Sequence, residues 1–402
     1  MRDFAFTVIQ ESDSYMAMAT TVEDVAATPE TIGVADNGHV EAPDILISDP
    51  DLESIWEKVK HGERLSAEDG VKILETEDFS AVGLMADYKK RQFSGDKVYF
   101  VLNRHLNPTN ICVLSCKFCD YAKKPGAEGA YEMSMEEMLD HLDGDIRELH
   151  VVGGHHPTWP FEFYVDMIRE LHNARPDVQI KAFTASEIDY FWRRWKVPPE
   201  ESLAIFKEAG LSSMPGGGAE VFSDRIHKLL LPGKAKADRW LEIHRIAHGM
   251  GIKSNCTILY GHVETFRERI DHLILLRELQ DETGGFLALI PLEYQVGYTK
   301  LRPRHTPPMD DLKMLAASRL ILDNVLAIKS YWVMLGEATA GMGLNFGAND
   351  LDGTIGKERI AHAALADSPA GIARRNMVAS IKDAGRIPVE RDALYNEITV
   401  YN

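Results

Sequence analysis

The stretch NPTNICVLSCKFCDYAKK (107–124) holds three of the chain's four cysteines, Cys112, Cys116 and Cys119. Their C-x3-C-x2-C spacing allows three thiolates on one loop to converge on a single metal centre. The apolar run KVYFVLN (97–103) precedes this loop and is typical of a buried strand. The stretch therefore predicts a metal-binding loop at the end of a strand.

The number of cysteines separates two kinds of metal centre. A structural zinc site is four-coordinate and closed, so His105 or Cys256 would have to supply the fourth ligand. Cys256 lies in the apolar run SNCTILY (254–260), which favours a buried core thiol. A 4Fe–4S cluster held by only three cysteines would instead keep one iron open to a bound small molecule.

From residue 97 onward, short apolar runs alternate with amphipathic segments six times. This alternation is typical of βαβ units with parallel strands and right-handed crossovers. Distinctive residues follow the runs, which favours a barrel-like sheet, because barrels collect functional residues at the carboxyl ends of their strands. The expected strands lie within KVYFVLN (97–103), RELHVVGG (147–154), QIKAFTASEI (179–188), LSSMPGGGAEV (211–221), KSNCTILYG (253–261) and GFLALIPLEY (285–294), and IKSYWVML (328–335) is a candidate seventh.

Composition sets limits on the domains and the partners. We expect a disordered or loosely docked tail over 1–50, a helical segment over 51–97, a core over 98–335 and an extension over 336–402 that closes the barrel. The net charge of −18 disfavours nucleic acid and anionic membranes as partners. Four cysteines are too few for a disulfide framework, and neither a signal peptide nor a membrane span is recognisable, so we expect a cytoplasmic protein.

The cysteine spacing, with the aromatic Phe118 directly before the last cysteine, resembles the signature of the radical S-adenosylmethionine (SAM) superfamily. The resemblance implies an α/β fold, a partial (βα)6 TIM-like barrel. It also implies a 4Fe–4S cluster on Cys112, Cys116 and Cys119, with SAM bound at the open iron. One electron from the cluster then splits SAM into methionine and a 5′-deoxyadenosyl radical.

The resemblance also implies contacts to SAM. Gly153 and Gly154 end a strand, and two glycines let the backbone approach a ligand, here the methionyl amine. Arg239 is expected to pair with the methionine carboxylate. The ribose is assigned to Ser186, Glu187 and Glu220, the last of which follows the glycines 216–218, and the surroundings of the cluster and the adenine to Phe118, Tyr121, Tyr260, Gly261 and Glu264.

Longer blocks, above all GGHHP (153–157) and PGGGAEVFSDR (215–225), look like those of the aminofutalosine synthases of menaquinone biosynthesis. The similarity runs from about residue 62 to about residue 365 and implies that the radical adds to the enol ether of 3-[(1-carboxyvinyl)oxy]benzoate. Aryl migration and loss of bicarbonate would give 6-amino-6-deoxyfutalosine. An electron donor such as flavodoxin or ferredoxin is implied as a partner.

Substrate contacts are less clearly marked in the sequence. The substrate has two carboxylates, which require cationic or hydrogen-bonding groups in a dry site. Residues 293–305 do not align with the segment expected there. The candidates are His155 and His156 beside the glycine pair, Arg302 and Arg304 in KLRPRH, and Asn349 and Asp352 at the barrel mouth.

Two alternatives stay open at this point. The dehypoxanthine futalosine cyclases and the deazaflavin F420-precursor synthases share parts of the same motifs. They would release free 5′-deoxyadenosine, whereas an aminofutalosine synthase incorporates the adenosyl group into its product. A protein that binds zinc or an iron–sulfur cluster without catalysis is the alternative from another class.

Overall fold

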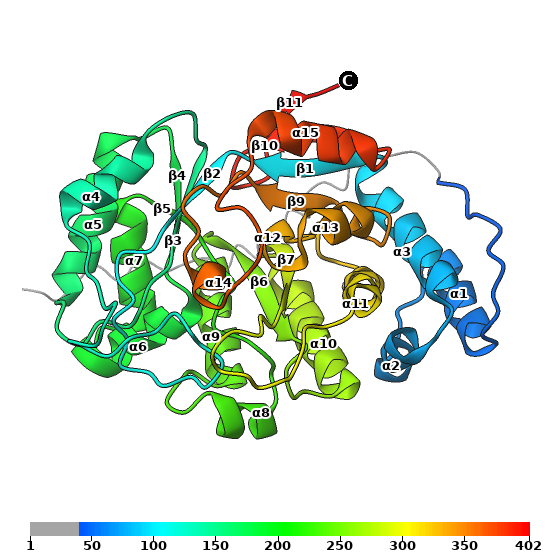
Figure 1. Ribbon diagram of the computed structural model, residues 1–402, viewed down its shortest axis with the longest axis horizontal. Helices are drawn as coiled ribbons and strands as arrows, with labels where there is room; N and C mark the ends of the chain where they lie inside the picture. The colour runs from blue at the N-terminus through cyan, green and yellow to red at the C-terminus, as the bar shows by residue number, and fades with distance from the viewer. Residues whose placement is uncertain (1–39) are drawn as a thin grey trace, which may run out of the picture.

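The computed structural model describes residues 40–402, and at its centre is a curled sheet of seven parallel strands (Figure 1). The strands lie side by side in chain order, from β2 to β8. This half-barrel confirms the predicted α/β fold class. Its strands are β2 (Asn103–Leu106), β3 (Glu148–Val151), β4 (Gln179–Ala182), β5 (Leu211–Met214), β6 (Lys253–Tyr260), β7 (Phe286–Glu293) and β8 (Ala327–Ile328).

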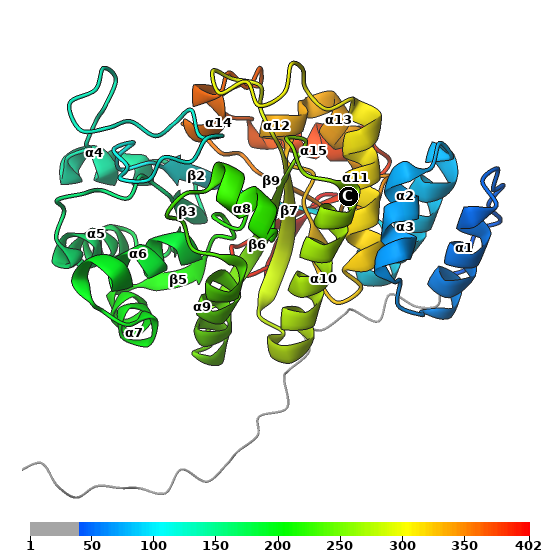
Figure 2. The same ribbon diagram turned by 90° about the horizontal axis from the view of Figure 1, so that it is seen from below.

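Six helical crossovers connect these strands and cover the outer face of the sheet (Figures 1 and 2). Their apolar stripes pack on the sheet, so that the side chains of one large core are buried between the two layers. The six units confirm the predicted (βα)6 series. The crossover helices are α4 (Met135–Leu139) with the 3-10 turn η1 (Asp140–Leu142), α5 (Phe161–Ala174), α6 (Ala185–Trp195) and α7 (Pro199–Ala209), α8 (Asp224–Leu230) and α9 (Ala237–Gly249), α10 (Phe266–Thr283), and α11 (Pro308–Ile321).

The first predicted strand belongs to a different sheet. Its apolar part forms β1 (Lys97–Val101), and the barrel begins only at β2. β1 is central in a four-stranded sheet of order β11-β10-β1-β9, formed with β9 (Asp350–Gly353), β10 (Ile387–Arg391) and β11 (Glu397–Val400). A strand buried on both faces reads as a continuous apolar run in either sheet, so the pattern cannot distinguish the two.

The second sheet lies across the open side of the half-barrel (Figure 1). At the β8 edge, Lys329 forms a parallel bridge with Asp350. At the β2 edge, the backbone N–H of Asn103 donates to Thr354 Oγ1, and that of His105 donates to the carbonyl oxygen of Gly356. The extension thus contacts both edges of the sheet. Its helices are α12 (Trp332–Leu335), α13 (Glu337–Gly343), α14 (Ile360–Ala363) and α15 (Arg374–Asp383).

Three N-terminal helices precede the sheets: α1 (Asp51–His61), α2 (Ala67–Glu75) and α3 (Phe79–Ser94). Helix α2 packs against α10 and α11, α3 packs against α11, and α1 packs on α2 and α3 (Figure 2). As predicted, α1 buries Leu52, Ile55, Trp56 and Val59, and Ser66 caps α2. Of the predicted tail, residues 1–39 lie outside the described residues. Residues 40–47 place apolar side chains against the core. Within residues 40–402, no helix has the length and apolar character needed to cross a bilayer.

Candidate active site

A cavity of about 310 Å³ opens at the carboxyl ends of the barrel strands. It contains Cys112, Cys116 and Cys119 at one side and α14 of the extension at another. Parallel strands bring all their carboxyl ends to one edge, which explains why residues distant in sequence meet here. Each strand ending contributes side chains, among them Asn107 after β2, Val152 after β3, Thr184 after β4, Pro215 after β5, Leu259 in β6, Leu292 in β7 and Tyr331 after β8.

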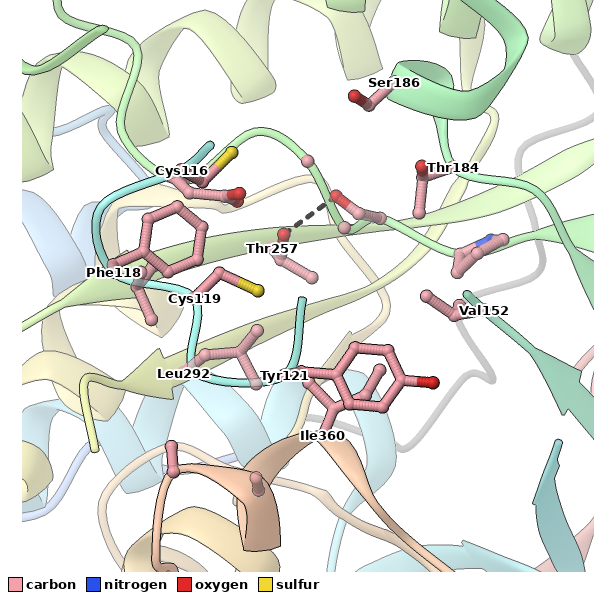
Figure 3. A pocket seen from close by; sticks show the side chains of 18 of the residues that line it. Cys116, Phe118, Cys119, Tyr121, Val152, Thr184, Ser186, Thr257, Leu292 and Ile360 are labelled. Atoms are coloured by element: carbon pink, nitrogen blue, oxygen red, sulfur yellow. Dashed lines mark hydrogen bonds between the residues drawn. The ribbon is translucent and has the colours of Figure 1, made fainter. Parts of the chain in front are cut away.

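All three loop cysteines line this cavity as free thiols. In Figure 3 the sulfur atoms of Cys116 and Cys119 point into the same space. Lys124 Nζ fixes the loop by donating to three successive carbonyl oxygens, those of residues 112–114, at 2.7–3.1 Å. Cys256 lies apart, fully buried in β6, where its thiol donates to the carbonyl oxygen of Ala288 at 3.5 Å. The core position predicted for Cys256 is confirmed.

The donor set fits a cluster with three thiolate ligands. The three soft thiol ligands face one cavity, and burial raises the pKa of Cys116 to about 11 while the nearby Lys234 cation opposes that rise. Cys112, Cys116 and Cys119 are therefore the residues that would hold the 4Fe–4S cluster.

Gly153 and Gly154 follow β3 and line the cavity beside the cysteine loop. A Cβ on Gly154 would overlap the carbonyl oxygen of Ile111, and one on Gly153 would lie 3.2 Å from that of Thr109. The N–H of Gly154 also donates to the Thr109 carbonyl at 2.8 Å. The two glycines therefore permit close contact with the cysteine loop, in addition to the contact with a ligand that the sequence predicts.

Ser186 and Glu187 line the cavity at the start of α6. Thr184 caps this helix, and both its N–H and its hydroxyl donate to Glu187 Oε2 at 2.8 Å. Burial raises the pKa of Glu187 to about 7, and the Thr184 hydrogen bonds oppose the rise. Ser186 Oγ is buried and has no hydrogen-bond partner within residues 40–402, so it is available to a ligand.

Lys234, in the loop between α8 and α9, is a cavity residue that the sequence analysis missed. Its ammonium pairs with Glu220 and lies 5.4 Å from the centre of the Phe118 ring. Burial lowers the pKa of Lys234, but Glu220 and Cys116 outweigh that effect and hold it above its usual value. The signal in the sequence is weak: a single lysine that follows the apolar run LLLPG (229–233).

Arg239 does not line the cavity. Its guanidinium donates to Asp189 Oδ1 at 3.2 Å and to Glu242 Oε2 at 2.8 Å on the outer side of the barrel. The structure therefore gives Lys234, rather than Arg239, the position of a cation inside the site. Its partners belong to the helices α6 and α9, and they already neutralise the charge of Arg239.

Two further predicted cofactor residues differ in placement. Tyr121 lines the cavity, and its hydroxyl donates to the Thr109 carbonyl at 3.0 Å. Tyr260 is fully buried outside the cavity, where its hydroxyl donates to Asp311 Oδ1 at 2.8 Å. Glu264 accepts from Arg269 Nε at 2.8 Å and is likewise buried beside the cavity rather than in it. The region predicted for the adenine therefore keeps Tyr121 and not Tyr260.

Of the two predicted histidines, only His155 lies in the cavity. His155 lines the cavity, stacked 5.0 Å from Tyr190, and its Nδ1 is buried without a partner in the described part of the chain. Burial lowers the pKa of His155 to about 3, so its ring is neutral. His156 lies outside the cavity, with Nε2 3.0 Å from Glu132 and Nδ1 accepting from the N–H of Trp159. His156 therefore orders its own turn.

Of the two residues predicted at the barrel mouth, Asn349 and Asp352, only Asp352 lies in the cavity. Asp352 lines the cavity and pairs with Lys329 at 2.9 Å, and this cation outweighs burial and holds the Asp352 pKa below its usual value. Asn349 is fully buried away from the cavity. Its Oδ1 accepts from Arg319 at 2.8 Å and from the N–H of Ile328 at 3.0 Å. The contacts of Asn349 are those of a core residue, so it is not carried into the proposed site.

Three segments border the cavity: the cysteine loop, the segment 293–305, and α14 with the residues that follow it. The N–H of Tyr298 donates to Asp120 Oδ2 of the cysteine loop at 2.9 Å, and Gly297 packs against Ala364, which follows α14. The segment 293–305, which the sequence analysis left unaligned, thus bridges the other two. Its arginines do not line the cavity: Arg302 donates to the Gly261 carbonyl at 3.0 Å, and Arg304 is exposed.

Comparison with known proteins identifies the class. Residues 106–276 match the radical SAM superfamily, and residues 283–401 match the CofH/MqnC C-terminal region. The fold is that of methylornithine synthase, with a TM-score of 0.65 at 17% identity over 83% of this chain and 97% of that one. The chain belongs to the radical SAM superfamily. It is an enzyme that uses a 4Fe–4S cluster and SAM.

Two relatives place it more closely. It is 44% identical to the aminodeoxyfutalosine synthase of Thermus thermophilus over 365 residues, which cover 89% of this chain and 98% of the relative. It is 37% identical to a 5-amino-6-(D-ribitylamino)uracil–L-tyrosine 4-hydroxyphenyl transferase of Methanosarcina mazei, over 86% of this chain and 92% of the relative. Both relatives match most of the chain, and the match to the CofH/MqnC C-terminal region covers the extension.

Proposed function

We propose that this enzyme transfers the 5′-deoxyadenosyl group of SAM to 3-[(1-carboxyvinyl)oxy]benzoate in menaquinone biosynthesis. With one water consumed, the products are 6-amino-6-deoxyfutalosine, methionine, bicarbonate and a proton. The observation that carries the proposal is the 44% identity over 98% of the Thermus thermophilus synthase, against 37% for the tyrosine transferase. SAM is then a co-substrate, because its adenosyl group enters the product.

The chain's own residues bind and orient SAM. Cys112, Cys116 and Cys119 hold the 4Fe–4S cluster, which when bound and reduced supplies one electron for cleavage of the sulfonium C–S bond. The backbone at Gly153 and Gly154 meets the methionyl amine, and Lys234 pairs with the methionine carboxylate. A buried cation next to the cysteine loop suits that carboxylate, since charge-assisted contacts are stronger away from water.

The ribose and the adenine occupy the strand ends farther along the sheet. The hydroxyl of Ser186 has no partner among residues 40–402, and Glu187 and Glu220 have carboxylate oxygens at the cavity wall. Thr257 Oγ1 donates to the Gly216 carbonyl at 2.8 Å and holds the glycine turn that separates these groups (Figure 3). Phe118 and Tyr121 supply aromatic surface on the side of the cysteine loop.

The walls around the reacting carbon are apolar. Leu259, Ile290, Leu292 and Ile360 line the cavity, and the bridge from Asp120 to Tyr298 covers it. A site of this kind excludes water and so protects a reactive intermediate from side reactions. His155 is neutral, its Nδ1 has no hydrogen-bond partner in the described part of the chain, and we assign it to the substrate. Asp352 carries a negative charge and holds the ammonium of Lys329 in place.

The second candidate function is that of the tyrosine 4-hydroxyphenyl transferases, which the 37% identity to the Methanosarcina mazei relative supports. The test is a pair of anaerobic incubations of the reduced, cluster-loaded enzyme with SAM, one with the enolpyruvyl benzoate and one with L-tyrosine and 5-amino-6-(D-ribitylamino)uracil, each followed by mass analysis. An adenosyl-containing adduct supports the synthase. Free 5′-deoxyadenosine without an adduct, together with turnover of tyrosine, would replace it with the transferase. The cytoplasmic location and a flavodoxin or ferredoxin donor stay predictions.

A further inference from the structure

Two histidines that the sequence analysis did not assign to the substrate lie next to each other on the cavity wall. His105 of β2 and His150 of β3 are direct partners in the strand register. Their ring centres are 4.7 Å apart and the rings meet edge to face at 68°. Both side chains line the cavity that holds the cysteine loop. The pair therefore forms one polar surface inside the barrel.

The pair has unused hydrogen-bonding capacity. The Nε2 atoms of His105 and His150 are buried, and neither has a hydrogen-bond partner among residues 40–402. Burial lowers the pKa of both rings, so each is a neutral imidazole with one N–H donor. Native proteins satisfy nearly all buried polar atoms. Two unsatisfied nitrogens at one cavity wall therefore indicate a place for a polar group of a ligand.

The position of the pair separates it from the residues assigned to SAM. On β2, His105 comes before Asn107 and the cysteine loop, and on β3, His150 comes before Val152 and the glycine pair. The histidines thus lie deeper in the barrel than the groups that contact SAM. Apolar side chains such as Val152 and Ile290 line the same cavity. Apolar walls with two N–H donors deep inside suit a flat ring that carries one acidic group.

The surrounding charges permit an anion at this place. Lys181 is the register partner of His150, and it pairs with Glu148 at 2.5 Å. Asp352, which also faces this end, is paired with Lys329 at 2.9 Å. Glu358 accepts from the N–H groups of Ile360 and Ala361 at the start of α14 and from His362 at 2.6 Å. Each nearby acid already has its own cation or donors.

We propose that His105 and His150 bind the ring carboxylate of the aromatic substrate and so determine that the acceptor is a benzoate. This inference rests on the proposed function, because that function supplies the benzoate. The two N–H groups donate hydrogen bonds to the two carboxylate oxygens at the inner end of the cavity. The enol ether then faces outward, toward the strand ends where SAM is assigned.

The test measures binding and needs no turnover. The cluster-loaded enzyme with SAM is titrated anaerobically with 3-methoxybenzoate and with the neutral 3-methoxybenzamide. The His105→Leu and His150→Leu variants are expected to weaken 3-methoxybenzoate binding by about tenfold to a hundredfold, as for loss of a hydrogen bond to a charged group. The amide is expected to bind them as it binds the wild type. His150→Gln keeps an N–H donor and is expected to restore part of the preference.

His141→Gln is the matched control, because His141 is a buried histidine outside the cavity. SAM affinity, measured on every variant, reports whether the site is folded, and His150→Gln serves if a leucine variant does not fold. Equal binding of acid and amide by the wild type, or an unchanged preference in the variants, overturns the role of the pair. If the variants lose the preference for the acid but the wild type forms no adenosyl adduct, the role of the histidine pair stands and the proposed reaction is refuted.

Discussion

The ammonium of Lys234 lies 5.4 Å from the centre of the Phe118 ring. Phe118 belongs to the CKFC segment of the cysteine loop, whereas Lys234 comes from the loop between α8 and α9. The contact therefore joins the two segments that would enclose the methionine end of SAM. Lys234 also pairs with Glu220, so its charge is held in place before any ligand binds.

Replacement of Lys234 by Met is expected to weaken SAM binding by about tenfold or more, because the methionine carboxylate of SAM would lose its cation. The matched control is Arg239→Gln, since Arg239 is tied to Asp189 and Glu242 outside the cavity. Anaerobic equilibrium dialysis with SAM measures both. An Arg239 variant that loses as much affinity as the Lys234 variant would contradict the assignment.

Substitution of Cys112, Cys116 or Cys119 by Ser is expected to abolish cluster assembly, because each supplies one of only three thiolates at the cavity. Cys256→Ala should retain the cluster, since Cys256 is buried in β6 and does not line the cavity. Iron and sulfide analysis after reconstitution distinguishes the variants. Loss of iron from the Cys256 variant with a native thermal transition would show that the ligand set is wrong.

Gly154→Ala is expected to displace the cysteine loop, because the added methyl group would overlap the Ile111 carbonyl oxygen. Overpacking of this kind costs about 1–3 kcal/mol of unfolding free energy and should also reduce the iron content. Gly249→Ala is the control: Gly249 ends α9, and its Cβ would meet no atom within 4 Å. Urea denaturation and iron analysis are measured side by side. Equal behaviour of the two variants would refute the close contact.

The buried Asp311 should make stability depend on pH. Burial and the nearby Glu293 together raise the pKa of Asp311 to about 7, so the folded protein holds a proton on Asp311 that the unfolded chain releases near pH 4. Asp311 therefore contributes on the order of 4 kcal/mol to the free energy of unfolding below pH 4, and this contribution is lost as the pH rises through about 7.

Asp311→Asn should remove this slope, so that the variant gains stability relative to the wild type between pH 5 and pH 8. Asp310→Asn is the neighbouring control, because Asp310 is only half-buried at the start of α11, where it pairs with Lys313. Urea midpoints at several pH values give the comparison. A wild type and an Asp311 variant with parallel profiles would show that the carboxyl is ionised throughout.

Asn349→Ala is expected to lower stability without altering the chemistry. Its removal leaves the fully buried Arg319 without the Oδ1 acceptor, which costs about 1–3 kcal/mol. The rate of adduct formation per folded, cluster-loaded enzyme should stay at the wild-type value below the unfolding transition. A folded variant that binds SAM normally and has a greatly reduced rate would restore the catalytic role predicted from the sequence.

Local patterns predicted much of the fold. The stripe of Leu52, Ile55, Trp56 and Val59 marked α1, and the alternating apolar runs marked β3 to β7, because helix and strand periodicities are properties of short segments. The sheet to which β1 belongs was not predictable. Its partners β9 and β10 lie about 250–290 residues away in the chain, and an apolar run carries no information about its neighbours.

The chemistry of the site follows the same division. The three cysteines and the aromatic between them lie within one short segment, so the sequence alone predicted a cluster-binding loop at the end of a strand. The choice of Lys234 over Arg239, the placement of His155 but not His156 in the cavity, and the pairing of His105 with His150 depend on where each side chain points. That direction is set by contacts between segments far apart in the chain, which only the folded barrel brings together.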